Sequence, residues 1–431
     1  MTEPTDEREE LLSSLQADAF QYFVKEVNPD NGLVVDCTKG GWPSSIAAIG
    51  MALSAYPVGV EHNFITREAA IERTLRNLRF FAGSEQSTNA EATGHKGFYY
   101  HFLDMQTGRR AWQCELSTID TTFLFAGMLA AAAYFDRDSS EEGEIRTLTD
   151  QLYKRADWGW AINGGATLTH GWTPERGFLP YRWDRYDEST LAYILGLGSP
   201  TCPLAAESYQ AHRSSCEWKR VYDYEYLYAG PLFTHQFSHI WIDFRGIQDS
   251  FMREHSSDYF ENSRRASYAQ REYAKRNPNE FKGYNEMCWG LTACEGPGPA
   301  ELNVDGVKRV FFDYVARGVP DGPDDGTLAP WAVVASLPFA PEIVLPTLEH
   351  FTELEIGVDH PYGLEATFNP TFPAEDRRTC GWLSPWHYGI NQGPIVLMIE
   401  NHRTEFLWRL IKKCPYVIDG LRRAGFVGGW L

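Results

Sequence analysis

Apolar residues recur at steps of three and four along most of the chain, which is the spacing that places them on one face of a helix. In the segment 66–83, for example, Ile71, Leu75, Leu78 and Phe81 follow this spacing, and a glycine stands where such a helix would end. The segment therefore predicts an amphipathic helix that buries one face and exposes the other.

Other segments are apolar on every side. The segment 117–135 has few polar side chains after its first turn, so a helix there has to be buried all round. Amphipathic segments alternate with such apolar, small-residue segments along the chain, and this pattern predicts about eleven or twelve helices. The clearest cover residues 11–23, 44–56, 66–83, 117–135, 144–158, 188–197, 233–244, 261–276, 331–336, 340–354 and 392–413.

Pairs of inner apolar and outer amphipathic helices are typical of a helical toroid. We therefore expect an all-α fold, a single (α/α)6 toroid barrel with long cleft-lining loops, formed by one domain over residues 1–431. A stack of helical repeats is the alternative, but no fixed repeat period is visible. The Pro- and Gly-rich segment 317–330 reads as a long loop within the domain.

Composition limits the classes of partner. The formal net charge of −19 repels phosphate backbones and anionic lipid surfaces, so we expect neither nucleic acid nor a membrane, although the charge also serves plain solubility. No apolar stretch reaches the about 18 residues of a membrane-spanning helix. None of the eight cysteines forms a CxxC pair, and we expect no metal and no organic cofactor.

The opening segment MTEPTDEREELLSSL is charged and lacks the apolar region of a signal peptide. This favours a cytoplasmic protein, or a periplasmic or secreted one if the chain is a trimmed form of a longer protein. A monomer or a weak homo-oligomer is expected.

Aromatic side chains make up 14% of the residues, and many stand beside Gly, Pro, Asp or Arg, as in GFYYHF, HGWTPERGFLPYRWDRY and CGWLSPWHYG. Rings in polar loops can stack on flat ligand faces, and sugar rings present such faces. Packing in the core accounts for some of these rings equally well.

The segment RWDRYDESTLAYILGLGSPTCP places three acids just before an apolar helix. Asp184 and Asp187 suit helix capping. Glu188 is left in or near the first turn, where the helix dipole favours its ionised form. Burial and the neighbouring Asp187 favour its protonated form, which is the state that a glycosidase acid requires.

Two further segments carry acids or histidines in apolar surroundings. Asp120 enters the apolar helix at 117–135, where it has to be satisfied by capping or face a cleft. His235 and His239 share a helix face, but the HExxH zinc motif is absent, so a polar cleft face is the better interpretation. The chain also lacks a phosphate-binding loop and a GxSxG motif, and the PDDG segment at 323–326 fits a metal-dependent terpenoid scaffold poorly.

Five motifs in order resemble one family. They are YDESTLAYILGLGSPTCP, GPLFTHQFSHIWIDFRGIQD, YNEMCWGLTACEGP, DDGTLAPWAVVASLPFAPE and GINQGPIVLMIENHRTEFLW. Together they resemble the glucoamylase-like hydrolases, which include bacterial endo-β-1,2-glucanases and the transglycosylase domain of cyclic β-1,2-glucan synthases. The resemblance covers roughly residues 10–427 and implies an (α/α)6 barrel, a β-1,2-glucan substrate and inverting hydrolysis.

The resemblance implies that Glu188 is the general acid, and it shows departures elsewhere. A family DLVETAFL-type motif corresponds to STIDTTFL, so its Glu falls on Asp120 and its Asp on Ser117. The family's GFYDAFN loop, whose carboxylate suits the base, has Ala366 at that place here, with Glu365 one position earlier. The family's GIDQGP has Asn391 in place of its Asp.

We expect an endo-acting β-1,2-glucanase in which Glu188 donates the proton and Asp120 or Glu365 activates water. The candidate substrate-binding residues are aromatic platforms and hydroxyl partners. They are Tyr100, Trp183, Tyr186, His235, Arg245, Gln248, Trp289, Trp386 and Asn391. A retaining hydrolase or transglycosylase on the same glucan, and a glucan-binding protein without activity, are the alternatives.

Overall fold

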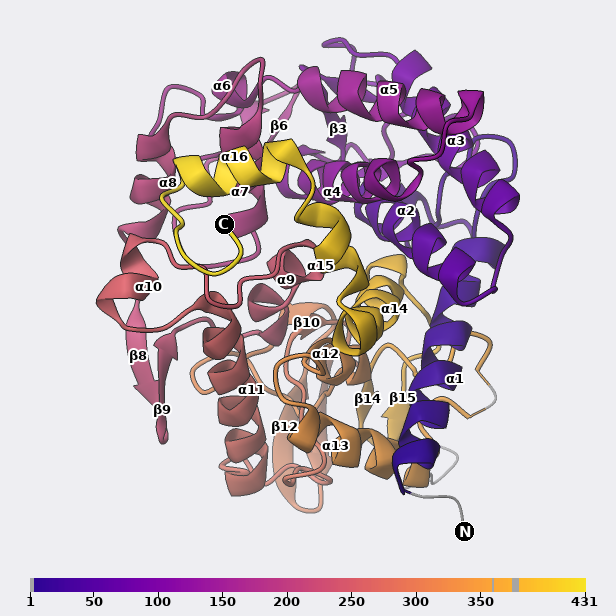
Figure 1. The fold of residues 1–431 in the computed structure, drawn as a ribbon. Helices are drawn as coiled ribbons and strands as arrows, with labels where there is room; N and C mark the ends of the chain where they lie inside the picture. Colours follow the sequence, from indigo (N-terminus) through magenta and orange to yellow (C-terminus); the bar gives the residue numbers. More distant parts are fainter. Residues whose placement is uncertain (1–3, 359, 374–379) are drawn as a thin grey trace.

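Two sets of helices alternate along the chain in the computed structural model, which describes residues 4–358, 360–373 and 380–431 (Figure 1). Helices of the inner set are almost completely buried. They are α2 (Ile46–Glu61), α4 (Thr118–Tyr134), α7 (Thr190–Gly198), α9 (Phe237–Trp241), α12 (Pro330–Ala335) and α14 (Gly389–Thr404). Between them the chain runs through an amphipathic outer set. These are α1 (Pro4–Lys25), α3 (Arg67–Gly83), α5 (Ser140–Lys154), α8 (Ala206–Arg213), α11 (Tyr259–Arg276) and α13 (Pro341–Glu353).

The inner helices pack on one another and on the outer ones. Helix α2 contacts α4 and α14, and α14 also contacts α9 and α12. Helix α1 is at the start of the chain and lies beside α14, which is near the end of the chain. The first and last parts of the chain therefore meet (Figure 1). Shorter helices complete the structure. They are α6 (Trp158–Ala161), α10 (Ser250–Glu254), α15 (Phe406–Ile411), α16 (Pro415–Arg423) and the 3-10 helix η1 (Leu232–His235).

The helices predicted from the apolar spacing are confirmed, but two are interrupted. The expected helix 233–244 bends at Gln236, whose side-chain amide donates to the carbonyl of Ala332 at 2.7 Å and the hydroxyl of Ser336 at 2.8 Å. The expected helix 392–413 divides at Glu405, which has a left-handed φ of 59° and whose carboxylate accepts from Arg245 at 2.7 Å. A bond from a side chain to another element thus accompanies each interruption.

The expectation of an all-α fold needs correction, because short strands pair the loops between helices. The largest sheet has the strand order β2-β3-β5-β6-β7 and joins segments that are far apart in sequence. Its strands are β2 (Gly94–His95), β3 (Phe98–Tyr100), β5 (Leu116–Ser117), β6 (Gly171–Thr173) and β7 (Gly177–Phe178). The molecule is therefore mostly helical, with its aromatic loops tied together by β-pairing.

The remaining strands form antiparallel pairs. They are β1 (Ser44–Ser45) with β4 (Phe102–Leu103), β8 (Trp218–Val221) with β9 (Tyr224–Leu227), β10 (Ala293–Cys294) with β13 (Val315–Ala316), β11 (Ala300–Val304) with β12 (Val307–Phe311), and β14 (Phe368–Asn369) with β15 (Trp382–Leu383). The loop predicted over 317–330 is confirmed between β13 and α12. In the described part of the chain, every helix is too short or too polar to cross a bilayer.

Candidate active site

A cavity of about 450 Å³ lies at the N-terminal ends of the inner helices. Each inner helix contributes a residue in or next to its first turn. These residues are Ser45, Asp120, Glu188, Phe237, Trp331 and Asn391. Strands and loops supply the rest of the lining, which includes the acids Asp36 and Glu295 and the base His101. The positive ends of the helix dipoles favour such a concentration of acidic side chains.

Glu188 precedes α7 and faces the cavity. Its backbone carbonyl accepts a hydrogen bond from the hydroxyl of Ser238 at 3.0 Å, which ties this segment to α9. Burial, together with the negative charges of Asp187 and Asp120, raises the pKa of the Glu188 carboxyl well above its ordinary value. The carboxyl is therefore biased toward its protonated form, as a proton donor has to be.

Asp120 lies in the first turn of α4 and makes a reciprocal contact with the N-cap residue. Ser117 donates its hydroxyl to Asp120 Oδ2 at 2.5 Å and accepts from the Asp120 N–H at 3.2 Å. The same carboxylate oxygen is 3.7 Å from His101 Nε2, while His101 Nδ1 is 2.9 Å from Glu115 Oε1. Burial lowers the pKa of His101, but Asp120, Glu115 and Asp36 outweigh it and raise that pKa to about 9. At neutral pH a positive imidazolium therefore stands beside Asp120.

Aromatic rings line the cavity on the side of Asp36. Trp42 donates its indole N–H to Asp36 Oδ2 at 3.1 Å, and its ring meets that of Trp112 edge-on at 4.8 Å. Trp112 also lies 5.1 Å from Phe102, has a left-handed φ of 53° and is 55% exposed. Burial raises the pKa of Asp36 to about 6. A large exposed ring held in an uncommon backbone conformation is the kind of feature found at ligand sites.

The β10–β13 pair brings a second group of side chains to the same cavity. Cys294, Glu295 and Tyr314 all line it. Burial raises the pKa of Glu295 to about 7, with Asp36 acting in the same direction and a hydrogen bond from Tyr388 opposing it. Glu295 is thus a partly buried acid that changes charge near neutral pH.

Four of the aromatic residues predicted to bind substrate lie in the core instead. Tyr100 and Trp289 are fully buried, and the indole N–H of Trp289 donates to Thr347 Oγ1 at 2.9 Å. The Trp183 indole stacks on His170 at 3.8 Å, and the buried Tyr186 ring packs 5.1 Å from His235. The structure places none of these four in the described lining of the cavity, because neighbouring side chains enclose their rings.

The three expected hydroxyl partners before residue 250 hold the fold together. His235 is buried, with Nε2 3.1 Å from the carbonyl of Ala229, and burial lowers its pKa to about 4. Arg245 donates to Asp243 and, at 2.7 Å, to Glu405. Gln248 forms a bridge with the backbone of Val427, and its side-chain amide donates to the carbonyl of Ser257 at 2.6 Å. Their polar atoms are bound to other elements, outside the described lining of the cavity.

Glu365 is fully buried and accepts from the backbone N–H of Gly357, with His360 Nε2 3.9 Å from its other oxygen. This carboxyl therefore lies outside the described lining of the cavity, where it was expected to activate water. Ala366 and the half-buried Trp386 pack in a small apolar cluster around Tyr388. Of the predicted site residues, the cavity brings together Glu188, Asp120 and Asn391, and their roles stay predictions.

The sequence analysis missed most of the lining, including the titratable residues Asp36, His101, Glu295 and Tyr314. The available signal was weak: Asp36 and Glu295 are acids in loops rich in Gly, Pro and aromatic residues, as in VVDCTKGGW and TACEGPGP. Such loops reach the cavity only through strand pairing between distant segments, which no local pattern records. Within the described residues, no group of three or more His, Cys, Asp or Glu side chains is arranged to hold a metal ion.

Comparison with known proteins finds matches over nearly the whole chain. Residues 180–415 match the family model named Glycoamylase, described as "Putative glucoamylase". A crystal structure from Bacteroides uniformis with the same description is 30% identical, has a TM-score of 0.86, and is matched over 98% of both chains. The complex of an endo-β-1,2-glucanase from Chitinophaga pinensis with sophorotriose and glucose is 25% identical, with a TM-score of 0.84, over 98% of this chain and 99% of that one.

A curated relative is the exo-β-1,2-glucooligosaccharide sophorohydrolase of Parabacteroides distasonis. It is 27% identical over 451 aligned residues. The alignment covers 96% of this chain and 58% of the relative, so the chain spans little more than half the length of that protein.

Proposed function

This chain belongs to the glucoamylase-like family of glycoside hydrolases, and from that premise we propose that it hydrolyses β-1,2-glucan with Glu188 as the general acid. The observation that carries the proposal is the placement of Glu188, a carboxyl biased toward its protonated form, in a cavity lined by other carboxyl groups and aromatic rings. Relatives named as acting on β-1,2-glucan support the substrate.

In this mechanism Glu188 transfers its proton to the glycosidic oxygen as the bond from that oxygen to C1 breaks. Water attacks C1 from the opposite face and gives a product of inverted configuration. The transition state resembles an oxocarbenium ion and carries positive charge. The negative groups around the cavity, including Asp120, stabilise that charge in an enclosed site where electrostatic interactions are strong.

Substrate binding in this proposal uses the rings of the cavity. Trp42, Trp112 and Tyr314 offer faces and edges on which glucosyl units can stack. The side-chain amide of Asn391 offers both a donor and an acceptor to sugar hydroxyls. The charge of the chain suits a neutral polysaccharide.

The proposal includes an (α/α)6 toroid, supported by the alternation of inner and outer helices, and endo action. Endo action is supported by the match to the Chitinophaga endo-glucanase, which covers 98% of this chain.

Incubation with linear β-1,2-glucan, followed by sizing of the products, tests the proposal. We expect a mixture of short oligosaccharides from the parent and a loss of about 10²–10⁴-fold in kcat from Glu188→Gln. Release of a single disaccharide would contradict endo action, and products longer than the substrate would indicate a transglycosylase. A Glu188→Gln variant as active as the parent, or no release from this glucan by the parent, would overturn the proposal.

A further inference from the structure

Glu295 is a cavity carboxyl for which the proposed mechanism has no role yet. It directly follows β10, and that strand pairs with β13 next to Tyr314. Both Glu295 and Tyr314 line the same cavity as Glu188, although more than 100 residues separate the two glutamates in the sequence. The position of Glu295 therefore depends on how the β10–β13 pair is held.

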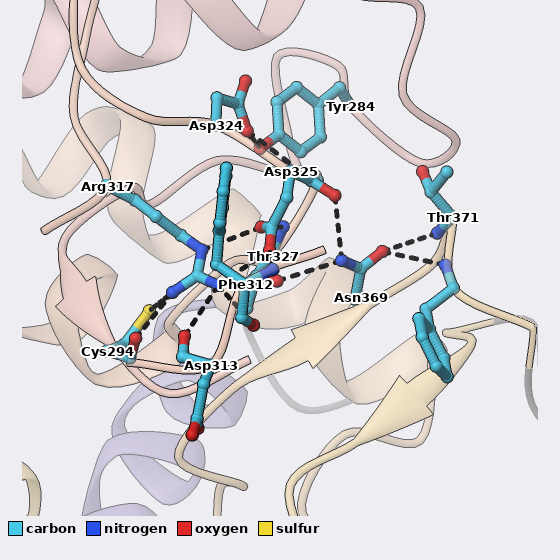
Figure 2. A network of polar contacts seen from close by, with 12 residues as sticks. Tyr284, Cys294, Phe312, Asp313, Arg317, Asp324, Asp325, Thr327, Asn369 and Thr371 are labelled. Carbon is cyan, nitrogen blue, oxygen red and sulfur yellow. Dashed lines mark hydrogen bonds and ion pairs between the residues drawn. The ribbon is translucent and has the colours of Figure 1, made fainter. Parts of the chain in front are cut away.

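A buried ion pair holds this segment. Arg317 is fully buried and forms two parallel bonds of 2.8 Å with the carboxylate of Asp325 (Figure 2). Its remaining donor group bonds the carbonyl of Cys294 at 2.6 Å, while Nη2 also reaches the carbonyls of Phe312 and Asp313 at 3.2 Å. One guanidinium thus bonds β10 at Cys294 and the segment just before β13 at Phe312 and Asp313.

The residue after Glu295, Gly296, also lies close to the Arg317 guanidinium. A Cβ placed on Gly296 would lie 2.3 Å from Arg317 Nη2, so only a glycine fits there without movement. The residue before Glu295 is bonded to Arg317 and the residue after it touches Arg317. The backbone of Glu295 is therefore fixed, which is what a catalytic group needs in order to be preorganised.

The other two cavity acids have partners that leave them less suited to accept a proton. Asp120 accepts from Ser117 and lies beside the His101 imidazolium, and Asp36 accepts from the Trp42 indole. Glu295 differs from both, because the lowering effect of Tyr388 on its pKa is outweighed by burial. The resulting Glu295 pKa of about 7 is also close to the value at which a base works best near neutral pH.

We propose that Glu295 is the second catalytic carboxyl group, the general base that activates water, held in place by the Arg317–Asp325 pair. This inference rests on the proposed hydrolysis. The carboxylate of Glu295 takes a proton from the attacking water, whose oxygen bonds to C1, while the electron pair of the breaking bond goes to the leaving oxygen that Glu188 protonates. Glu188 ends as a carboxylate and Glu295 as a carboxylic acid, and solvent exchange restores both.

The test compares Glu295→Gln and Glu295→Ala with the parent on linear β-1,2-glucan. We expect Glu295→Gln to lower kcat by about 10²–10⁴-fold with a small change in KM. Azide needs no base, so it is expected to restore turnover in Glu295→Ala and give the α-glycosyl azide. Glu301→Gln is the matched control, because Glu301 lies on the next strand with a 55% exposed side chain paired to Lys308, and this variant should equal the parent.

Near-UV circular dichroism of each variant shows whether the fold is retained. A parent that degrades the glucan together with a Glu295→Gln variant within about tenfold of it would overturn this inference and leave the proposed function standing. Rescue by azide of Asp120→Ala instead of Glu295→Ala would assign the base to Asp120. Release of the β-anomer by the parent, seen by NMR, would exclude attack by a water that Glu295 activates. A parent without activity would overturn both proposals.

Discussion

At the scale of single residues, burial changes the protonation of the acids around the cavity. The pKa values of Asp36 and Asp187 rise to about 6 and that of Glu295 to about 7, in each case chiefly because burial disfavours the charged form. Such values suit acid and base chemistry near neutral pH, but they oppose folding. The folded protein holds protons that the unfolded chain has already released, so these groups reduce stability as the pH rises.

The raised pKa of Glu295 predicts that this residue affects the stability of the protein in a pH-dependent way. Its pKa is about 7 in the folded protein and 4.5 ordinarily, so its contribution to the free energy of unfolding falls between those pH values. We expect Glu295→Gln to raise the Tm by a few degrees at pH 8 and to leave it unchanged at pH 4, measured by thermal unfolding. The groups that face Glu295, namely Asp36, Asp313 and Tyr388, remain in the variant.

In the same experiment Glu301→Gln serves as the control and should change the Tm at neither pH. An equal change for Glu295→Gln at pH 4 and pH 8 would mean that packing, and not the charge of Glu295, causes it.

Trp112 is 55% exposed at the cavity, where its ring contacts those of Trp42 and Phe102. We expect Trp112→Ala to raise KM for β-1,2-glucan by about tenfold, or 1.4 kcal/mol, because a stacking surface is lost, while kcat and the Tm stay close to the parent. Tyr181→Ala is the matched control, since Tyr181 is also an exposed ring but lies outside the described lining of the cavity. An unchanged KM for Trp112→Ala would show that glucan does not stack on this indole.

The sequence predicted some site residues better than others, and the reason is their distance from a helix start. Glu188, Asp120 and Asn391 stand in or next to a first helical turn, so the helix pattern places them at the N-terminal ends of inner helices. Tyr100 and Trp289 were placed by their polar neighbours in sequence, yet both are core residues. Neighbours in sequence do not decide which face of a short strand or loop turns inward.

At the scale of elements, the helices follow from a local period and the strands do not. A helix of four or five turns repeats its apolar spacing several times, so the signal accumulates along the sequence. Strands such as β5 contain two residues, which cannot show an alternation. Strand β5 forms because β3 and β6 lie on either side of it, and that pairing joins residues near 99, 117 and 171.

Close packing of α2 on α4 depends on two glycines. A Cβ on Gly127 would lie 2.1 Å from the carbonyl oxygen of Gly50, and a Cβ on Gly50 would lie 2.2 Å from that of Phe123. We expect Gly127→Ala to lower the free energy of unfolding by about 3 kcal/mol or more, because the two buried helices would have to separate. Denaturant unfolding measures the change.

Gly143 provides the comparison, because it also lies inside a helix, α5, but the nearest atom to its added Cβ is the end of the Arg146 side chain at 3.8 Å. Gly143→Ala should stabilise the protein by about 0.5–1 kcal/mol through the lower entropy of the unfolded chain. Similar effects of the two substitutions would show that the distance between α2 and α4 adjusts easily.

At the scale of the whole molecule, one buried carboxylate connects the beginning of the chain with its end. Glu400 of α14 accepts from Gln16 of α1 at 3.0 Å, lies 2.6 Å from His62 Nε2 at the end of α2, and accepts from Thr404 at 2.7 Å. The prediction of a single domain implies that loss of this connection destabilises the entire protein, because no part of it folds independently.

Burial alone would raise the pKa of Glu400, but hydrogen bonds from His62, Thr404 and Gln16 outweigh it and lower that pKa. The resulting stabilisation is present above the ordinary value of 4.5 and is lost as the pH falls through the folded value. We expect Glu400→Gln to cost about 1–3 kcal/mol at pH 7, with the difference from the parent shrinking below pH 4.5.

Calorimetry measures this change and tests the single domain at the same time. One transition should remain in both proteins, and kcat should equal that of the parent, because Glu400 lies outside the described lining of the cavity. Glu349→Gln removes a half-exposed ion pair with Arg8 that also joins α1 to the rest of the molecule, and it should cost less than about 1 kcal/mol. Two separate transitions, one sensitive to Glu400 and one not, would show that the chain contains more than one folding unit and that its first and last helices belong to only one of them.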